Sequence, residues 1–191
     1  MFCMNATDDS EASDAKTQET RSVIPPEAKR VFKGVIFEIW QWEQKLYDGS
    51  TTTFEKLRRP DTVEVLAVTE DGKIIMEEQE QPVRRQKFFS LPGGRADGGA
   101  TPIKEAKREL LEETGYASAD WELLASVEPF MDNDYRVHYF IARGAKKVAE
   151  PTLDAGEKIT LKLLVLDELI NLAENPLFRS GELARMLLVL R

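Results

Sequence analysis

Cysteine is almost absent from this chain: Cys3 is the only one among 191 residues. A single cysteine cannot form a disulfide within the chain, so an oxidising compartment is not indicated. No apolar run is long enough to cross a bilayer. The N-terminus also lacks the basic segment followed by an apolar segment that marks a secretory signal. We therefore expect a cytoplasmic protein.

An excess of positive charge is also missing, because 34 acidic residues oppose 26 lysines and arginines and leave a formal net charge of -8. Such a chain repels nucleic-acid backbones and anionic membrane surfaces, so neither is expected as a partner. A substrate that carries phosphate would need a cation supplied at its binding site. The composition, 42% hydrophobic and 31% charged, is typical of one catalytic domain with a real core.

The sequence divides into three stretches of different character. Residues 1–25 are polar, acidic and almost free of large apolar side chains, which predicts a flexible acidic leader. Residues 26–60 contain two β-rich runs, VFKGVIFEIWQW and TTTFEKLRR, on either side of the turn-forming DGS. This pattern predicts an N-terminal β-hairpin subdomain. Residues 61–191 are expected to form the main domain.

Strands and helices alternate within the main domain. Apolar or alternating runs predict strands in VEVLAV, KIIMEEQ, WELLASVEPF, YRVHYFIARG and ITLKLLVL, and a short strand in FFS that leads into a glycine-rich loop. Helices are predicted in TPIKEAKRELLEETG, DELINLAE and SGELARMLLVL. Strands on both sides of a central helix predict an α+β fold, an α/β/α sandwich with a mixed β-sheet.

The central helix is the best delimited element. Thr101 is placed as its N-cap, Pro102 at its first helical position and Gly115 just past its end.

Three glutamates of this helix, Glu109, Glu112 and Glu113, are related by steps of three and four and share one face. At a separation of about 6 Å and an effective dielectric of about 20, each like-charge pair costs on the order of 3 kcal/mol, which a bound divalent cation would reverse. Mg²⁺ is the natural candidate because it prefers carboxylate oxygens, and Mn²⁺ is an alternative. The competing interpretation is that these side chains form the solvated face of an amphipathic helix.

The segment GGRADGGATPIKEAKRELLEETGY resembles the box of the Nudix hydrolase family, G-x5-E-x7-R-E-U-x-E-E-x-G-U with U apolar. The matching positions are Gly94, Arg108, Glu109, Leu110, Glu112, Glu113, Gly115 and Tyr116. Ala100 departs from the box, where an early glutamate supports the box arginine; Glu105, one helical turn before Arg108, can reach that arginine instead. The flanking strings FEKLRRPDTVEVLAVTEDGKIIMEEQ and GEKI are similar to the ADP-ribose pyrophosphatase subgroup.

The resemblance implies Mg²⁺-dependent hydrolysis of the pyrophosphate bond of ADP-ribose or a related nucleoside-diphosphate sugar, giving a mononucleotide and a sugar phosphate. It implies that Glu109, Glu113 and the carbonyl of Gly93 bind the metals, with Glu112 sharing in this role and in catalysis. Arg108 holds the carboxylates in the family.

Substrate contacts are expected from Gly94, Arg84 and Arg85. The two arginines follow Gln81, which stands where related sequences often have an arginine, and they could take its place on a phosphate. Exposed loop arginines without a ligand are the competing interpretation.

The residue that positions or deprotonates the attacking water is expected in the loop Asp154 to Glu157. Metal-bound glutamates are poor bases because the cations lower their pKa, so a free carboxylate must approach the water. Related enzymes carry an acidic residue in this loop, but Ala155 stands at the aligned position. Glu157 is the first choice and Asp154 the second; activation of water by metal alone is the alternative.

A homodimer built partly from the hairpin is expected, because an isolated two-stranded unit is marginal and because the resemblance also suggests it. Two other functions compete with hydrolysis of a nucleotide sugar. One is a non-catalytic Nudix-fold module that senses a nucleotide, and the other is a housecleaning nucleoside triphosphate pyrophosphatase. The crowded carboxylates favour catalysis over sensing.

Overall fold

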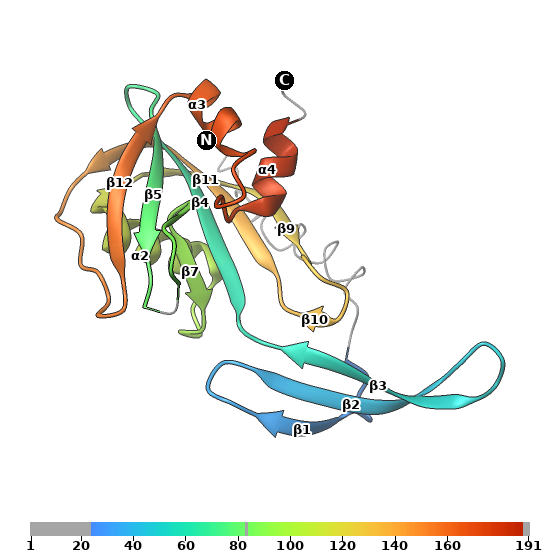
Figure 1. Ribbon diagram of the computed structural model, residues 1–191. Coiled ribbons are helices and arrows are strands. Elements are labelled where there is room, and N and C mark those ends of the chain that lie inside the picture. The colour runs from blue at the N-terminus through green and yellow to red at the C-terminus, as the bar shows by residue number, and fades with distance from the viewer. Residues whose placement is uncertain (1–23, 83, 189–191) are drawn as a thin grey trace, which may run out of the picture. The chain divides into compact units, whose positions relative to one another are not determined.

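A computed structural model describes residues 24–82 and 84–188 of the chain, and the predicted acidic leader lies almost entirely outside these residues. The described chain forms two compact units. The small unit contains residues 24–59 and 130–134, and the large unit contains residues 60–129 and 135–188 (Figure 1).

The small unit is a four-stranded sheet in the order β1-β2-β3-β10. Its strands are β1 (Lys29–Lys33), β2 (Glu38–Lys45), β3 (Thr51–Arg58) and β10 (Asn133–Asp134). The β-rich run VFKGVIFEIWQW holds two strands, β1 and β2, because the chain turns at Gly34, whose N–H donates to the Phe37 carbonyl over 2.8 Å. The DGS turn is confirmed, with Gly49 in the left-handed region at φ 88°.

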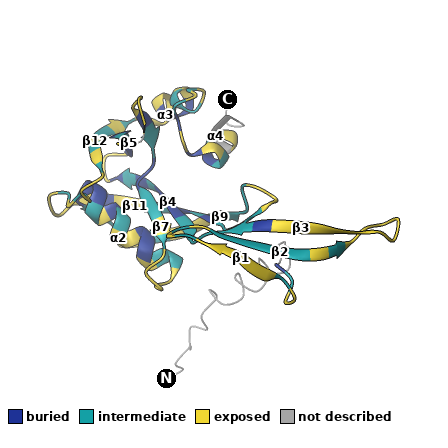
Figure 2. Cartoon of the chain, turned by 60° about the horizontal axis from the view of Figure 1, so that its bottom comes forward, coloured by how far each residue is buried: buried dark blue, intermediate teal, exposed yellow. Residues whose placement is uncertain are grey.

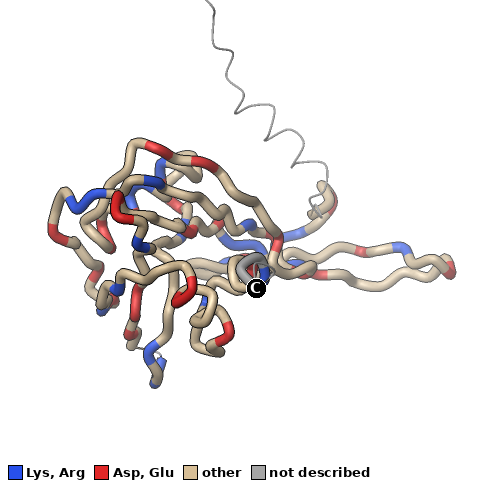
Figure 3. The backbone as a smooth tube through the Cα atoms, turned by 90° about the horizontal axis from the view of Figure 1, so that it is seen from above, with Lys and Arg blue, Asp and Glu red and all other residues tan. Residues whose placement is uncertain are grey.

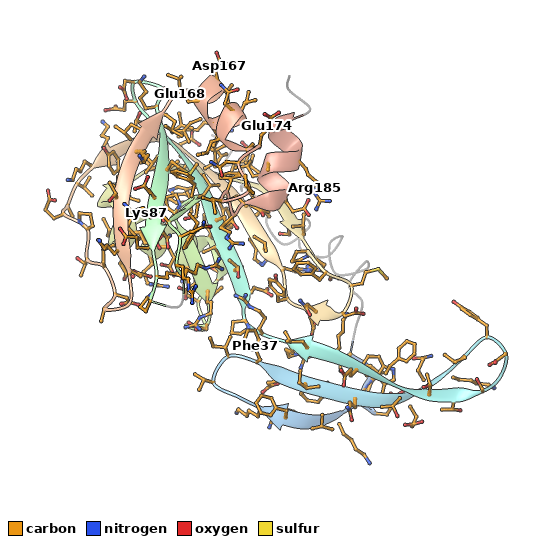
Figure 4. The ribbon with its side chains drawn as sticks, viewed as in Figure 1. Phe37, Lys87, Asp167, Glu168, Glu174 and Arg185 are labelled. Atoms are coloured by element: carbon orange, nitrogen blue, oxygen red, sulfur yellow. The ribbon has the colours of Figure 1, made fainter. Side chains whose placement is uncertain are left out.

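Several large apolar side chains of the small unit are exposed to solvent. Phe32 is 55% exposed and Phe54 is 43% exposed. Every residue of β1 is exposed, as Figure 2 shows along that strand. Phe37, labelled in Figure 4, is a further exposed aromatic side chain beside β2. These side chains therefore leave much of their apolar surface open to solvent.

The large unit is built on a mixed sheet in the order β12-β5-β4-β11-β8, with β6, β7 and β9 paired to β5, β4 and β11 respectively. The strands are β4 (Asp61–Thr69), β5 (Ile74–Glu80), β6 (Phe88–Ser90), β7 (Gly93–Ala96), β8 (Tyr116–Ala117), β9 (Asp120–Val127), β11 (Val137–Lys147) and β12 (Lys158–Leu164). β4 and β11 are parallel, while the neighbouring pairs are antiparallel. The predicted mixed sheet is confirmed.

Helices of the large unit pack on both faces of this sheet. They are α2 (Pro102–Thr114), α3 (Leu166–Leu172) and α4 (Gly181–Leu188). One core cluster joins Val63 and Val65 of β4 to Leu110 of α2. A second cluster lies on the other face and joins β5 and β11 to Leu169 of α3 and Leu183 of α4. The α+β sandwich predicted from the sequence is confirmed. No helix in residues 24–82 and 84–188 is long and apolar enough to span a bilayer.

β4 and β5 diverge after their tight turn, and this divergence positions the site. The two strands pair only at Val68 and Ile74. Beyond that point β5 takes β6 as its partner, while β4 takes β7 and brings Glu64 opposite Gly93. The link between β6 and β7 therefore carries the chain from the β5 side to the β4 side, just before the glycine-rich loop that leads to α2.

Candidate active site

The predicted boundaries of α2 agree with the structure. Pro102 begins the helix after Thr101, although the Thr101 side chain makes no capping hydrogen bond and its carbonyl accepts the Lys104 N–H instead. Gly115 ends the helix in the left-handed region at φ 73°. A Cβ at Gly115 would lie 2.1 Å from the Ala149 carbonyl oxygen, so no larger residue fits there.

Arg108 gathers three carboxylates of α2 around one guanidinium. Its Nε donates to Glu105 over 2.9 Å, its Nη2 to Glu109 over 2.6 Å and its Nη1 to Glu112 over 2.5 Å. Glu105 is only 4% exposed, so the contact with Arg108 is anchored in the protein interior. The prediction that Glu105 reaches the arginine in place of a residue at Ala100 is confirmed.

Glu113 lies deeper than the other box glutamates and contacts the glycine-rich loop. It is 4% exposed, and its Oε2 accepts the Gly93 N–H over 2.6 Å. Gly93 is itself tightly placed, because a Cβ there would lie 2.1 Å from the Val63 carbonyl oxygen. At Gly94 a Cβ would meet Oε1 of Glu109 at 2.4 Å. The two glycines therefore bring backbone groups within reach of the glutamate side chains.

A buried acid that the sequence prediction missed lies beside Glu113. Glu77 of β5 is fully buried, and Gln79 donates to its Oε2 over 2.7 Å. The Glu113 side chain is close enough to Glu77 to affect its pKa. The alternation of side chains along a strand could have predicted the burial of Glu77. Ile75, Glu77 and Gln79 point to the same face of β5, and Ile75 packs in the core against α2.

Burial raises the pKa of several of these carboxyl groups. Loss of water is the main cause that raises the pKa of Glu77 and that of Glu113. The charges of Glu109 and Glu157 raise both further, and the charge of Glu77 also raises the pKa of Glu113. Burial also raises the pKa of Glu109, against the attraction of Arg108. The site thus concentrates carboxyl groups that would be more stable beside additional positive charge.

Most of the residues predicted for the site line one open cavity of about 680 Å³. The predicted residues on its wall are Gly93, Gly94, Arg108, Glu109, Glu112, Glu113, Asp154 and Glu157. The loop from β11 to β12 thereby faces α2 across the cavity. Within that loop, Oε2 of Glu157 accepts the Asp154 N–H over 3.0 Å, so the two candidate acids are tied together.

Arg84 and Arg85 are the predicted residues that do not line this cavity. They line a second hollow of about 320 Å³, which shares Gln81 and Glu157 with the first. The Arg84 guanidinium lies 5.0 Å from the centre of the Phe88 ring. Lys87, labelled in Figure 4, lines the same hollow and pairs with Glu78 over 3.0 Å. The structure places these cations beside the candidate site, not in it.

The donor groups at the site fit a hard divalent cation, because they are carboxylate oxygens and backbone carbonyls. Glu77 adds a buried oxygen, Oε1, that accepts no hydrogen bond from the described residues. As the side chains stand, no three Asp, Glu, His or Cys residues in the described part of the chain are arranged to hold one ion together. Arg108 holds oxygens of Glu109 and Glu112 in this arrangement.

Acidic and basic residues are interspersed along both units, as Figure 3 shows. The concentration of carboxyl groups around α2 is therefore a local feature of the cavity.

Comparison with known proteins matches the chain to one family. The NUDIX domain matches residues 58–185. The methanol dehydrogenase activator of Bacillus methanolicus is 32% identical over 143 residues, which cover 73% of this chain and 77% of that protein. The ADP-ribose pyrophosphatase of Bacillus subtilis (strain 168) is 30% identical over 152 residues, or 77% of this chain and 80% of that one.

A solved structure described as an ADP compounds hydrolase shares the fold, with a TM-score of 0.71 at 19% identity over 90% of this chain and 95% of that chain. The family match spans the cavity, α2 and the sheet that supports them. The chain therefore belongs to the NUDIX domain family and is a Nudix hydrolase.

Proposed function

We propose that this protein hydrolyses the pyrophosphate bond of ADP-ribose or a related nucleoside-diphosphate sugar in a reaction that requires Mg²⁺. The products would be a mononucleotide and a sugar phosphate. The observation that carries the proposal is the single cavity in which the α2 carboxylates, Arg108 and the acids of the 154–157 loop face one another. Two relatives named ADP-ribose pyrophosphatase support the choice of substrate.

Glu109, Glu113 and the Gly93 carbonyl would hold the cation, with Glu112 beside them. When bound, the ion would neutralise charge on the phosphates and activate water. Arg108 keeps the carboxylates of Glu109 and Glu112 oriented toward the cavity. The role of α2 is therefore to hold negative oxygens in fixed positions before the substrate arrives.

Glu157 is proposed to orient the attacking water, and Asp154 is the second choice. Both line the cavity opposite α2. The hydrogen bond from the Asp154 N–H fixes one oxygen of Glu157 and leaves the other able to accept a proton from water. Mutation of each acid to its amide separates the two assignments.

Arg84 and Arg85 are proposed to bind a phosphate of the substrate from the neighbouring hollow. That hollow joins the cavity at Gln81 and Glu157, so a substrate with two phosphates could extend from one into the other. Guanidinium groups suit this role because they bind phosphate oxygens in pairs.

The small unit is proposed to form a homodimer interface in a cytoplasmic protein. The exposed aromatic side chains Phe32, Phe37 and Phe54 support this proposal, since association would remove them from water. Neither nucleic acid nor membrane is proposed as a partner.

Activation of a dehydrogenase is a second candidate function, because one relative bears the name methanol dehydrogenase activator. Such an activator could act with or without hydrolysis. The organised carboxylates around Arg108 favour a hydrolytic role, because a module that only senses a nucleotide has no use for them.

The test is to incubate the protein with Mg²⁺ and a panel of nucleotide sugars, nucleoside triphosphates and nucleoside diphosphates, and to measure released mononucleotide and sugar phosphate. We expect turnover of ADP-ribose or another nucleoside-diphosphate sugar, and its loss in EDTA. Preference for triphosphates would favour the housecleaning alternative. No turnover of any compound would favour the sensing module.

A further inference from the structure

Glu77 is an acidic residue in a place that a strand normally fills with an apolar side chain. Its neighbours on β5, Ile75 and Met76, are fully buried in the hydrophobic core, and Glu77 is equally buried. Burial of a carboxyl group costs several kcal/mol unless a partner compensates for the lost water. Gln79 compensates one oxygen only.

The second oxygen of Glu77 is the unusual one. Oε1 is buried and accepts no hydrogen bond from any residue in the described ranges. This unsatisfied oxygen is a separate observation from the crowding of acids, because Oε1 is itself shielded from water. A buried oxygen without a donor is costly unless something absent from the protein alone satisfies it.

Glu77 does not line the cavity itself, but Gln79, which donates to it, does. The Glu113 side chain is close enough to affect the pKa of Glu77, and the charges of Glu157 and Glu109 raise that pKa, so these carboxyl groups lie near one another. Glu113, Glu109 and Glu157 all line the cavity. Glu77 is therefore the most deeply buried member of a cluster of carboxylates that β5, α2 and the 154–157 loop contribute.

Arg108 supplies positive charge to the outer members of this group. Its three hydrogen bonds to side chains go to Glu105, Glu109 and Glu112. Within the part of the chain that the structure describes, no ion pair is formed by Glu77 or Glu113 with a lysine or arginine. The inner pair is thus where a divalent cation would be most strongly stabilised.

We propose that Glu77 supplies an additional carboxylate ligand, through Oε1, to a divalent cation shared with Glu113. The proposal rests on the metal-dependent function proposed above and extends its ligand set beyond the box helix to β5. An oxygen ligand of this kind suits Mg²⁺ or Mn²⁺.

The test measures cation binding without substrate. Mn²⁺ is titrated into the full-length protein, into Glu77→Gln and into Glu78→Gln, and free Mn²⁺ is followed by electron paramagnetic resonance. Glu78 is the matched control, because it is the next residue on β5 and pairs with Lys87 and Lys162 on the other face. We expect the Mn²⁺ dissociation constant to rise on the order of tenfold to a hundredfold in Glu77→Gln and to stay within about twofold in Glu78→Gln.

Equal affinity in Glu77→Gln and the native protein would overturn the proposal, as would an equal loss in both variants. A crystal of the native protein grown with Mn²⁺ provides a second measurement that does not depend on the variant folding. An anomalous peak about 2.0 to 2.6 Å from a Glu77 oxygen supports the ligand assignment. A peak that lies farther than this distance from both Glu77 oxygens refutes the assignment.

These results are separable from the proposed function. Mn²⁺ binding that weakens in Glu77→Gln while no nucleotide sugar is hydrolysed would leave the ligand in place and remove the substrate assignment. Hydrolysis of a nucleotide sugar together with unchanged Mn²⁺ affinity in Glu77→Gln would keep the substrate assignment and remove Glu77 as a ligand.

Discussion

Glu105→Gln tests whether the interior anchor of Arg108 supports the whole site. Glu105 is 4% exposed, whereas the Arg108 side chain is 43% exposed. A hydrogen bond between charged groups contributes about 1.5 to 3 kcal/mol, and partial exposure of Arg108 places this one at the low end. We therefore expect the unfolding free energy to fall by about 1.5 kcal/mol.

Activity should fall as well, because Arg108 also orients Glu109 and Glu112. A misplaced carboxylate weakens stabilisation of the transition state, and a loss of about 1.4 kcal/mol there is a tenfold fall in kcat/KM. Urea unfolding gives the stability, and steady-state hydrolysis of the best nucleotide sugar gives the rate.

Glu122→Gln is the matched control, because Glu122 pairs with Arg143 over 2.5 Å on an exposed surface outside the cavity. An exposed pair of this kind contributes about 0 to 1 kcal/mol, so stability should change little and activity not at all. If Glu105→Gln behaves like Glu122→Gln in both assays, the anchoring role of Glu105 is wrong.

Four further predictions address the rest of the molecule. Glu109→Gln should lower kcat on the order of 10²-fold while the protein stays folded, and full activity of this variant or of the native protein in EDTA would contradict the metal assignment. Glu157→Gln should slow turnover on the order of 10²-fold with little change in KM, and a larger loss in Asp154→Asn would transfer the role to Asp154. Phe54→Ser should shift the mass measured by light scattering from dimer toward monomer, whereas a monomeric native protein at micromolar concentration would remove the dimer proposal. Burial raises the pKa of Glu64 from 4.5 to about 7. The contribution of Glu64 to stability is therefore fully present below pH 4.5 and is lost as the pH rises through about 7. The melting temperatures of the native protein and of Glu64→Gln should diverge across that pH range.

Local sequence rules were sufficient for the helix that carries the site. The boundaries of α2 depend on Pro102 and Gly115, which act through their own backbone conformations. The contact between Glu105 and Arg108 follows from helical spacing alone. The mixed sheet and its two helical layers also follow from the order and periodicity of the apolar runs.

Features that depend on distant parts of the chain were missed. The burial of Glu77 results from pairing of β5 with β6 and from packing against α2, neither of which is encoded in MEEQ itself. The short strand β10 pairs with β3, and the paired residues Arg58 and Asp134 are 76 positions apart in the sequence. A strand of two residues is too short to leave a periodic pattern, and its partner is too far along the chain to be inferred. The break between β1 and β2 was not predicted, because the sequence is β-rich on both sides of Gly34.

The fourth strand of the small unit has a consequence for how the chain is made. β10 adds to β3 in parallel, and Arg58 Nε donates to the Asp134 carboxylate over 2.6 Å, with the Asp134 side chain only 2% exposed. During synthesis, β1, β2 and β3 leave the ribosome well before the residues that complete their sheet, so an edge of β3 stays open while most of the large unit's strands emerge. A gene segment that encodes residues 26–60 alone would therefore not transfer this unit to another protein intact.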